Sequence, residues 1–304
     1  MSTSAPHHPM RAAGFMFAST ISFGFMVIAI RFASQTLHTF EIAFFRNLFG
    51  LLAVLPLVIG VDPASLRTQQ LGRYFIRCVI GIGSMLAGFW SIGHLPLAQA
   101  ISLSYSTPVF VTIAATLFLG EHVRGRRWAA VAMGFIGVLV IVRPGSAEFS
   151  TGTLIALLSA VLSGIVAIQI KQLSRVDAAN TIVLYTYLFW VPISLVPALF
   201  VWEWPQGTAW VWVVAAGVFG TAGQVLWTHA LKLGEVSALT PISFAQLPLV
   251  AFAGWMWFGE SVDRWTWVGA AIILTSNAYI AHREALLSRR AASEAPTAGA
   301  KPGE

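Results

Sequence analysis

Long apolar segments follow one another along almost the whole chain, and short polar connections separate them. A helix needs about 20 mostly apolar residues to cross the ~30 Å hydrocarbon core of a bilayer. Most of the segments have about that length, so the pattern predicts an all-α membrane protein with ten transmembrane helices. The predicted spans are residues 12–30, 41–60, 74–92, 98–119, 128–142, 152–170, 181–201, 209–231, 237–258 and 265–281.

Two stretches of the chain carry the same markers when the sequence is shifted by 139 positions. In each stretch an apolar run ends in Gly-Glu, and a Trp follows seven residues after the Glu. A repeat of that length indicates two matching halves of one molecule. The shift superimposes Glu121 on Glu260, Trp128 on Trp267 and Tyr105 on Phe244.

Each half holds five predicted spans, and because five is odd the second half must enter the membrane from the opposite side. The predicted halves are residues 12–143 and 151–282, with a cytoplasmic tail at 1–11 and a disordered cytoplasmic tail at 288–304. Inverted repeats are a design of secondary transporters, which expose a central site to the two sides of the membrane in turn. The predicted fold is therefore two inverted five-helix repeats.

The basic residues agree with this topology. If the N-terminus is cytoplasmic, only Arg31, Arg143 and Arg264 of the 18 Lys and Arg residues lie outside, and Arg46 lies within a span. Such a positive-inside bias places both termini in the cytoplasm. The net charge of +6 thus follows from topology and predicts no nucleic-acid partner. The predicted partners are a small-molecule substrate and the lipid bilayer, and the sequence is compatible with a monomer while leaving the oligomeric state open.

Composition supports the membrane assignment. Hydrophobic residues make up 57% of the 304 residues and charged residues only 10%, whereas an average soluble domain carries about 25% charged residues. The mean hydropathy is +0.76. The spans leave little chain for a soluble domain, and the lone Cys78 excludes an internal disulfide.

Several short motifs occur along the chain: Phe23-Gly24 to Arg31, Phe44-Phe45-Arg46, Leu95-Pro96-Leu97-Ala98, Tyr105 with Pro108-Val109-Phe110, Leu117-Phe118-Leu119-Gly120-Glu121, Leu247-Pro248 and Gly259-Glu260. They resemble the repeat of the drug/metabolite transporter superfamily, specifically its ten-helix EamA branch. A match to the YddG-type aromatic amino-acid exporters within that branch is carried by Tyr105 three residues before Pro108. The resemblance implies export of amino acids, other metabolites or drugs across the bacterial inner membrane. Pro248 lies one residue nearer its Gly-Glu than Pro108 does, which leaves the register of the ninth span open.

Neutral polar and aromatic side chains in the predicted spans form the candidate substrate site. Such groups suit a small amphipathic solute, whose ends need hydrogen bonds and whose body needs apolar contact. The alternative is that Ser and Thr bond their own helix backbone. Pro108 and Pro248 lie about half-way along their spans and predict kinks, either as part of the pathway or as tolerated distortions. The predicted substrate-binding residues are Trp90, Ser104, Tyr105, Thr107, Gln169, Gln224, Thr228, Ser243 and Gln246.

The 12 acidic residues all fall in loops, tails or span ends. Proton- and sodium-driven carriers commonly place a carboxylate in the membrane interior, so the pattern predicts facilitated movement or exchange. His229 is the one candidate for an intramembrane proton acceptor, although a histidine bonded near a helix end is the favoured interpretation. For Arg46, snorkelling to the nearby interface is favoured over binding a substrate carboxylate.

We therefore predict an alternating-access exporter of small amphipathic metabolites, with amino acids, including aromatic ones, as the main candidates. It would act as a uniporter or an exchanger. The alternatives are a proton-coupled exporter of drugs or other metabolites and a membrane-embedded lipid-modifying enzyme. The sequence has no Gly-x-x-x-x-Gly-Lys phosphate loop, and its histidines lack metal-ligand spacing apart from His7-His8. Accordingly we expect no enzyme activity, no cofactor and no metal.

Overall fold

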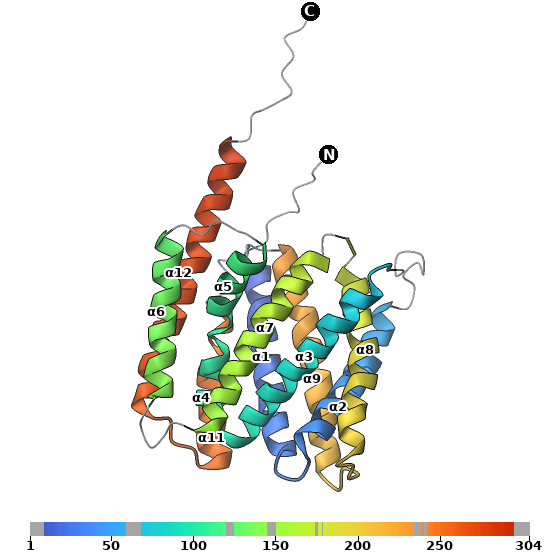
Figure 1. Ribbon diagram of the computed structural model, residues 1–304. Helices are drawn as coiled ribbons and strands as arrows, with labels where there is room; N and C mark the ends of the chain where they lie inside the picture. The colour runs from blue at the N-terminus through green and yellow to red at the C-terminus, as the bar shows by residue number, and fades with distance from the viewer. Residues whose placement is uncertain are drawn as a thin grey trace, which may run out of the picture.

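The computed structural model describes residues 9–58, 68–119, 125–144, 150–173, 176–177, 179–233, 239 and 242–294, and within them every long element is an α-helix (Figure 1). The helices are α1 (Pro9–Ala33), α2 (Thr39–Val58), α3 (Leu71–His94), α4 (Leu97–Ser104), α5 (Thr107–Leu119), α6 (Gly125–Val142), α7 (Thr151–Leu173), α8 (Ala179–Leu199), α9 (Ala209–Leu233), α11 (Gln246–Phe258) and α12 (Arg264–Glu294).

Seven helical stretches are long and apolar enough to cross a membrane, and each overlaps one of the predicted spans. Two further apolar helices, Trp128–Val142 and Gln246–Phe258, are shorter. The last predicted span lies inside α12. The helical membrane architecture is therefore confirmed. The seven stretches are Met10–Ala33, Thr39–Pro56, Leu71–His94, Leu97–Ala114, Thr151–Ile170, Thr181–Leu199 and Ala209–Trp227.

The prolines begin helices instead of kinking them in the middle. The predicted span 98–119 consists of α4 and α5, with Tyr105 and Ser106 in a turn between them, and Pro108 is the second residue of α5. Likewise α11 begins only at Gln246, and Pro248 is its third residue. The first N–H groups of a helix have no partner within it, so proline costs no hydrogen bond there. The prediction of mid-helix kinks is corrected to two helix breaks.

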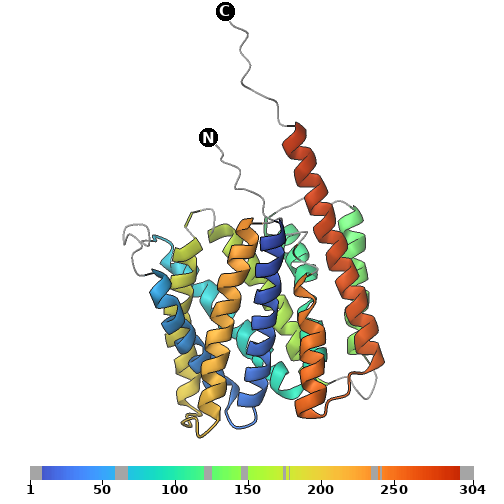
Figure 2. The ribbon, with the colours of Figure 1, turned by 180° about the vertical axis from the view of Figure 1, so that it is seen from behind.

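Helices α4 and α5 continue in one direction as a single span, and the other helices that follow one another run in alternating directions across one bundle (Figures 1 and 2). We call the end where α1 begins and α12 finishes the upper end, and the opposite end the lower end. Helix α1 packs beside α9, α3 beside α7, α2 beside α8, and α6 beside α12. Helix α12 rises beyond the other helices and continues to Glu294, so the tail predicted as disordered from residue 288 is helical up to that residue. Its Ala, Leu, Arg and Glu residues have high helix propensity.

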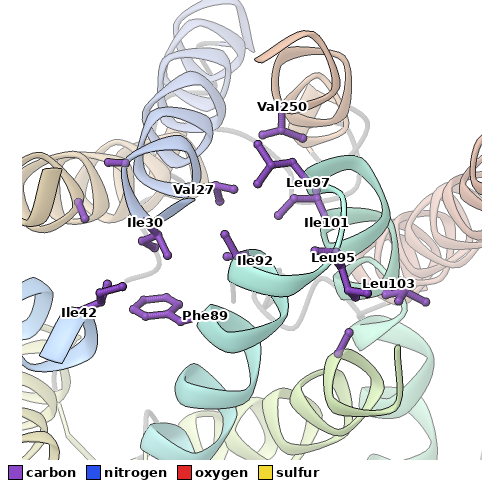
Figure 3. Packing of buried hydrophobic residues seen from close by; sticks show 14 of the residues in the cluster. Val27, Ile30, Ile42, Phe89, Ile92, Leu95, Leu97, Ile101, Leu103 and Val250 are labelled. Atoms are coloured by element: carbon purple, nitrogen blue, oxygen red, sulfur yellow. The ribbon is translucent and has the colours of Figure 1, made fainter. Parts of the chain in front are cut away.

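A buried apolar cluster fills the lower end of the bundle between α1, α2, α3, α4 and α11 (Figure 3). Most of the labelled side chains point into the space between these helices, and most members of the cluster are less than 5% exposed. Dense packing of this kind leaves no passage for a solute. The lower end is therefore closed in this structure. The labelled members on these helices are Val27, Ile30, Ile42, Phe89, Ile92, Leu97, Ile101, Leu103 and Val250.

Helices α6 and α12 approach each other through paired glycines. A Cβ on Gly137 would lie 2.8 Å from the carbonyl oxygen of Gly269, and a Cβ on Gly269 would lie 2.6 Å from the carbonyl oxygen of Gly137. Ser276 Oγ also donates to the Ala130 carbonyl at 2.5 Å. Small residues let helix backbones come together in lipid, where van der Waals packing drives association.

We predict that Gly137→Ala destabilises the protein, because the added methyl group meets backbone atoms that can move only with the helix. Overpacking of this kind costs about 1–3 kcal/mol. The measurement is the thermal unfolding midpoint of the purified protein in detergent. Gly14→Ala is the matched control, since a Cβ at Gly14 has no neighbour within 4 Å. Equal midpoints for the two variants would contradict the prediction.

Candidate functional site

A cavity of about 460 Å³ lies inside the bundle, and we call it the central cavity. Helices α1 to α4 form one part of its wall, and α7, α8 and α11 form the rest. Both halves of the chain therefore line it. Its volume is in the range of pockets that hold small organic molecules. The polar and aromatic groups on its wall include Phe23, Arg46, Ser84, Phe89, Ser104, Ser159, Ser163, Trp190 and Gln246.

The two helix breaks place two of the predicted residues on this wall. Ser104 is the last residue of α4, immediately before the first break, and is solvent-exposed although it lies within a spanning segment. Its hydroxyl donates to the Ile101 carbonyl at 2.7 Å. Gln246 is the first residue of α11, immediately after the second break. Within the described part of the chain its amide makes no hydrogen bond, so it is available to a solute.

Tyr105 joins the two breaks and does not line the central cavity. Its hydroxyl donates to the Ser243 carbonyl at 3.1 Å, and its ring meets Phe244 edge-on with 5.4 Å between centroids. Asn277 Nδ2 in turn donates to the Tyr105 carbonyl at 2.7 Å. The tyrosine therefore holds together two non-helical turns from opposite halves of the chain.

Two other predicted residues of the first half are occupied by neighbouring groups. The Thr107 hydroxyl donates to the Ser104 carbonyl at 2.7 Å, which is the backbone bonding considered as the alternative. Trp90 stacks on the ring of His94 with 3.9 Å between centroids. Both lie outside the wall of the central cavity.

The remaining predicted residues lie in the second half, and those whose side chains are described do not line the central cavity. Gln169 lines another cavity of about 430 Å³ between α3 and α7, together with residues that include Arg73. Gln224 and Ser243 each have interaction partners. The Thr228 side chain is outside the described residues. Of the predicted binding residues whose side chains are described, the cavity wall thus includes Ser104 and Gln246.

His229, the candidate proton acceptor, is exposed near the upper end of α9. Its Nδ1 lies 2.9 Å from the carbonyl oxygen of Val225 in the same helix, and its ring is 5.7 Å from that of Phe15. This arrangement matches the interpretation of a histidine bonded near a helix end. The central cavity contains neither His229 nor its neighbours.

Arg46 on α2 turns into the central cavity instead of snorkelling to the interface, which corrects the favoured interpretation. The residue is 9% exposed, and its guanidinium lies 5.8 Å from the ring centroid of Tyr187 and 5.9 Å from that of Trp190. Its Nη1 donates to Asn47 Oδ1 at 3.1 Å. Among the described residues no carboxylate pairs with it and no acceptor faces its Nε. The sequence signal was a charge inside an apolar run, where insertion costs ~2.5–3.5 kcal/mol.

Sequence reasoning also missed a serine cluster between α3 and α7. Ser84 Oγ lies 2.9 Å from the Ser159 carbonyl oxygen and 2.7 Å from Ser163 Oγ. The Ser159 hydroxyl donates back to the Ser84 carbonyl at 2.8 Å. The three serines add uncharged hydroxyl groups to the cavity wall. Single serines in separate apolar runs gave no signal that they meet.

The second Gly-Glu motif fastens the lower end of the bundle. Gly259 ends α11 in the left-handed conformation with φ 63°, and this turn brings Glu260 back toward α1 and α4. Glu260 Oε1 pairs with Arg31 Nη2 at 2.6 Å, and its Oε2 accepts the Leu97 N–H at 2.7 Å. The motif therefore marks a helix end, as expected, and also supplies an ion pair. The first copy, Gly120-Glu121, lies outside the described residues.

We predict that Glu260→Gln lowers the thermal unfolding midpoint, because it leaves the Arg31 guanidinium without its counter-ion. The two side chains are 17% and 10% exposed, and breaking a mostly buried pair costs on the order of 3 kcal/mol. The control is Asp263→Asn, whose pair with Arg143 is 39% and 25% exposed and is worth ~0–1 kcal/mol. Similar decreases in both variants would contradict the buried role of Glu260.

We predict that Ser104→Cys reacts with a small water-soluble maleimide, because the central cavity exposes this position. Ser102→Cys is the control, since Ser102 lies on the same helix and is 0% exposed. The native Cys78 is also 0% exposed, which keeps background labelling low. Labelling rates are compared by mass spectrometry on purified protein. Equal rates at positions 102 and 104 would show that water does not reach the cavity wall.

Comparison with known proteins agrees with this architecture. A crystal structure that covers 92% of this chain and 98% of its own superimposes with a TM-score of 0.62 at 20% identity, which shows a shared fold. The riboflavin transporter of Vibrio cholerae is 32% identical over 94% of this chain and 98% of its own length. The pseudopaline exporter of Pseudomonas aeruginosa is 30% identical over 87% of this chain and 94% of its own.

A third relative, the S-adenosylmethionine uptake transporter of Rickettsia felis, is 26% identical over 89% of this chain and 92% of its own. The model of the EamA-like transporter family matches twice, at residues 10–143 and at residues 150–281. Together these matches cover nearly the whole chain. The chain therefore belongs to the EamA-like transporter family of the drug/metabolite transporter superfamily.

Proposed function

We propose that this protein is a secondary transporter that carries a small organic solute through the central cavity by alternating access. The observation that supports the proposal is the composition of the cavity wall. Arg46 and Ser104 come from the first half of the chain, and Trp190 and Gln246 come from the second. A site shared by two halves can face either side of a membrane as the halves rock against each other.

Ten spans in two inverted repeats are part of this proposal, and the packing supports it. Helix α1 packs on α9 as α7 packs on α3, and α2 and α6 pack on their counterparts α8 and α12. Tyr105 and Phe244, which the shift of 139 positions superimposes, meet ring to ring. Residues that a two-fold axis exchanges can touch only where they lie near that axis. The same shift of 139 positions superimposes the first helix break, at residues 105–106, on the second, at residues 244–245.

We propose riboflavin as the first candidate substrate, since a relative of that name is 32% identical over nearly the full chain. Riboflavin combines a planar ring that carries carbonyl acceptors with a flexible polyhydroxyl chain. The aromatic groups, the Arg46 donors and the serine hydroxyls of the cavity complement those parts. The three relatives described above carry the names of other solutes than amino acids, so amino acids move from the main candidate to a comparison compound.

We further propose uncoupled movement down the gradient of the solute or exchange. No carboxylate of the described residues lines the central cavity. Glu41 and Glu260 lie at helix ends, where backbone N–H groups donate to both. The three relatives include one named for uptake and one for export, and direction would follow from the gradient. The proposed location is a bacterial inner membrane with both termini in the cytoplasm, supported by the shared upper end of α1 and α12.

Flux into proteoliposomes tests this function. We expect saturable riboflavin movement above that of protein-free vesicles, with a rate that follows the riboflavin gradient and is unchanged by an imposed pH gradient. His229→Ala should transport at the wild-type rate. Absence of riboflavin flux would reject this substrate, and a screen with S-adenosylmethionine and amino acids would follow. Strict dependence on the pH gradient, lost in His229→Ala, would favour the proton-coupled alternative.

A further inference from the structure

Two hydrogen-bond donors on the wall of the central cavity have no acceptor among the described residues. They are Arg46 Nε–H on α2 and Trp190 Nε1–H on α8. The guanidinium of Arg46 lies 5.9 Å from the ring centroid of Trp190, so the two donors are neighbours. A buried donor without an acceptor lowers stability, and native proteins retain few of them. Two at one cavity point to an acceptor that arrives with a ligand.

Each donor is seated against a glycine. A Cβ on Gly220 of α9 would lie 3.0 Å from Arg46 Nη2 and 3.3 Å from its Nε, and a Cβ on Gly81 of α3 would lie 3.2 Å from Trp190 Nε1. Gly81 and Gly220 are 139 positions apart, which is the shift that relates the two halves. Corresponding positions on α3 and α9 thus provide the space that the two donors occupy.

The positive charge of Arg46 also lacks a counter-ion among the described residues. Its close neighbours are neutral: the Asn47 amide, the Met26 sulfur at 4.0 Å from Nη2, and the rings of Tyr187 and Trp190. Oxygen acceptors bind most strongly to a guanidinium when they are charged or conjugated, and the planar fork favours a planar partner. A protein carboxylate in this place would have competed with the ligand.

We infer that Arg46 and Trp190 form a two-donor site that binds a planar oxygen-acceptor group of the transported solute. That group is a carboxylate or the conjugated carbonyls of a ring. The inference rests on the proposed function and specifies which part of the solute the protein recognises. The solute body lies against the apolar and aromatic wall that includes Phe23 and Phe89. Arg46 and Trp190 come from α2 and α8, which correspond in the two halves, so the solute bridges them.

Equilibrium binding to the purified protein tests the site, with riboflavin and the aromatic carboxylate indole-3-acetate as probes. For the preferred probe we expect Arg46→Gln to weaken binding about 10- to 100-fold and Trp190→Phe, which removes only the N–H, about tenfold. Trp255→Phe is the control, since Trp255 is 64% exposed on the outer face of α11. Gly220→Ala keeps the charge but displaces the guanidinium, and it should also weaken binding. A preference for indole-3-acetate identifies a carboxylate, and a preference for riboflavin identifies ring carbonyls.

The outcomes separate this inference from the proposed substrate. If the wild type binds riboflavin and both donor variants bind it equally well, the two-donor site is wrong and the substrate proposal stands. If the wild type binds neither probe, the thermal midpoint of ligand-free Arg46→Met decides. A charge kept unpaired for a ligand predicts a midpoint at or above that of the wild type. A decrease would show that Arg46 is structural and would overturn the inference.

Discussion

A lipid bilayer offers no water to an unpaired backbone group, so any break in a spanning helix must be satisfied by the protein itself. This constraint governs the centre of the molecule. The breaks before Pro108 and Pro248 meet, and side chains supply what the helices lack: the Tyr105 hydroxyl donates to the Ser243 carbonyl, and Asn277 donates to the Tyr105 carbonyl. The first break is thus satisfied by α12, and the Tyr105 hydroxyl of the first break in turn satisfies a carbonyl beside the second. The same breaks end α4 at Ser104 and begin α11 at Gln246, and thereby set two polar residues on the cavity wall.

The lower end of the bundle depends on a different kind of contact. There Glu260 connects the end of α1 through Arg31 with the start of α4 through the Leu97 N–H. Beneath the central cavity, the apolar cluster around Ile30 and Ile92 completes the closure. The pair joins Arg31 on α1 to Glu260 in the turn after α11, and such a pair can be exchanged for water when the two segments part. The glycine contact between α6 and α12 cannot adapt in that way. The ion pair is therefore suited to a helix contact that opens and closes, and the glycine contact to one that stays fixed.

The sequence contained the order and approximate positions of the helices because those depend on local apolar content, and it contained the repeat because the markers recur in both halves. It did not reveal whether Pro108 kinks a helix or starts one, since both conformations satisfy the proline ring. Nor did it reveal which polar residues meet. Arg46 could turn to the interface or inward, and the space that Gly220 leaves beside its guanidinium is visible only in the structure. Nothing in the sequence distinguished Trp190 from the other tryptophans. That its indole N–H has no acceptor among the described residues is visible only in the structure.

Among the described residues Arg46 has no carboxylate partner, and this arrangement is consistent with the needs of a carrier. A protein carboxylate beside the guanidinium would relieve the cost of its burial, yet every solute molecule would then have to displace that carboxylate before binding. In the two-donor site that we propose, the solute would stabilise the charge on binding, and this stabilisation would be lost when the solute leaves. The unpaired donors lower the stability of the folded protein whenever no solute is bound. Contacts elsewhere, such as Glu260 with Arg31, hold the surrounding helices and offset this loss. Stability and recognition are thus assigned to different places along the same helices.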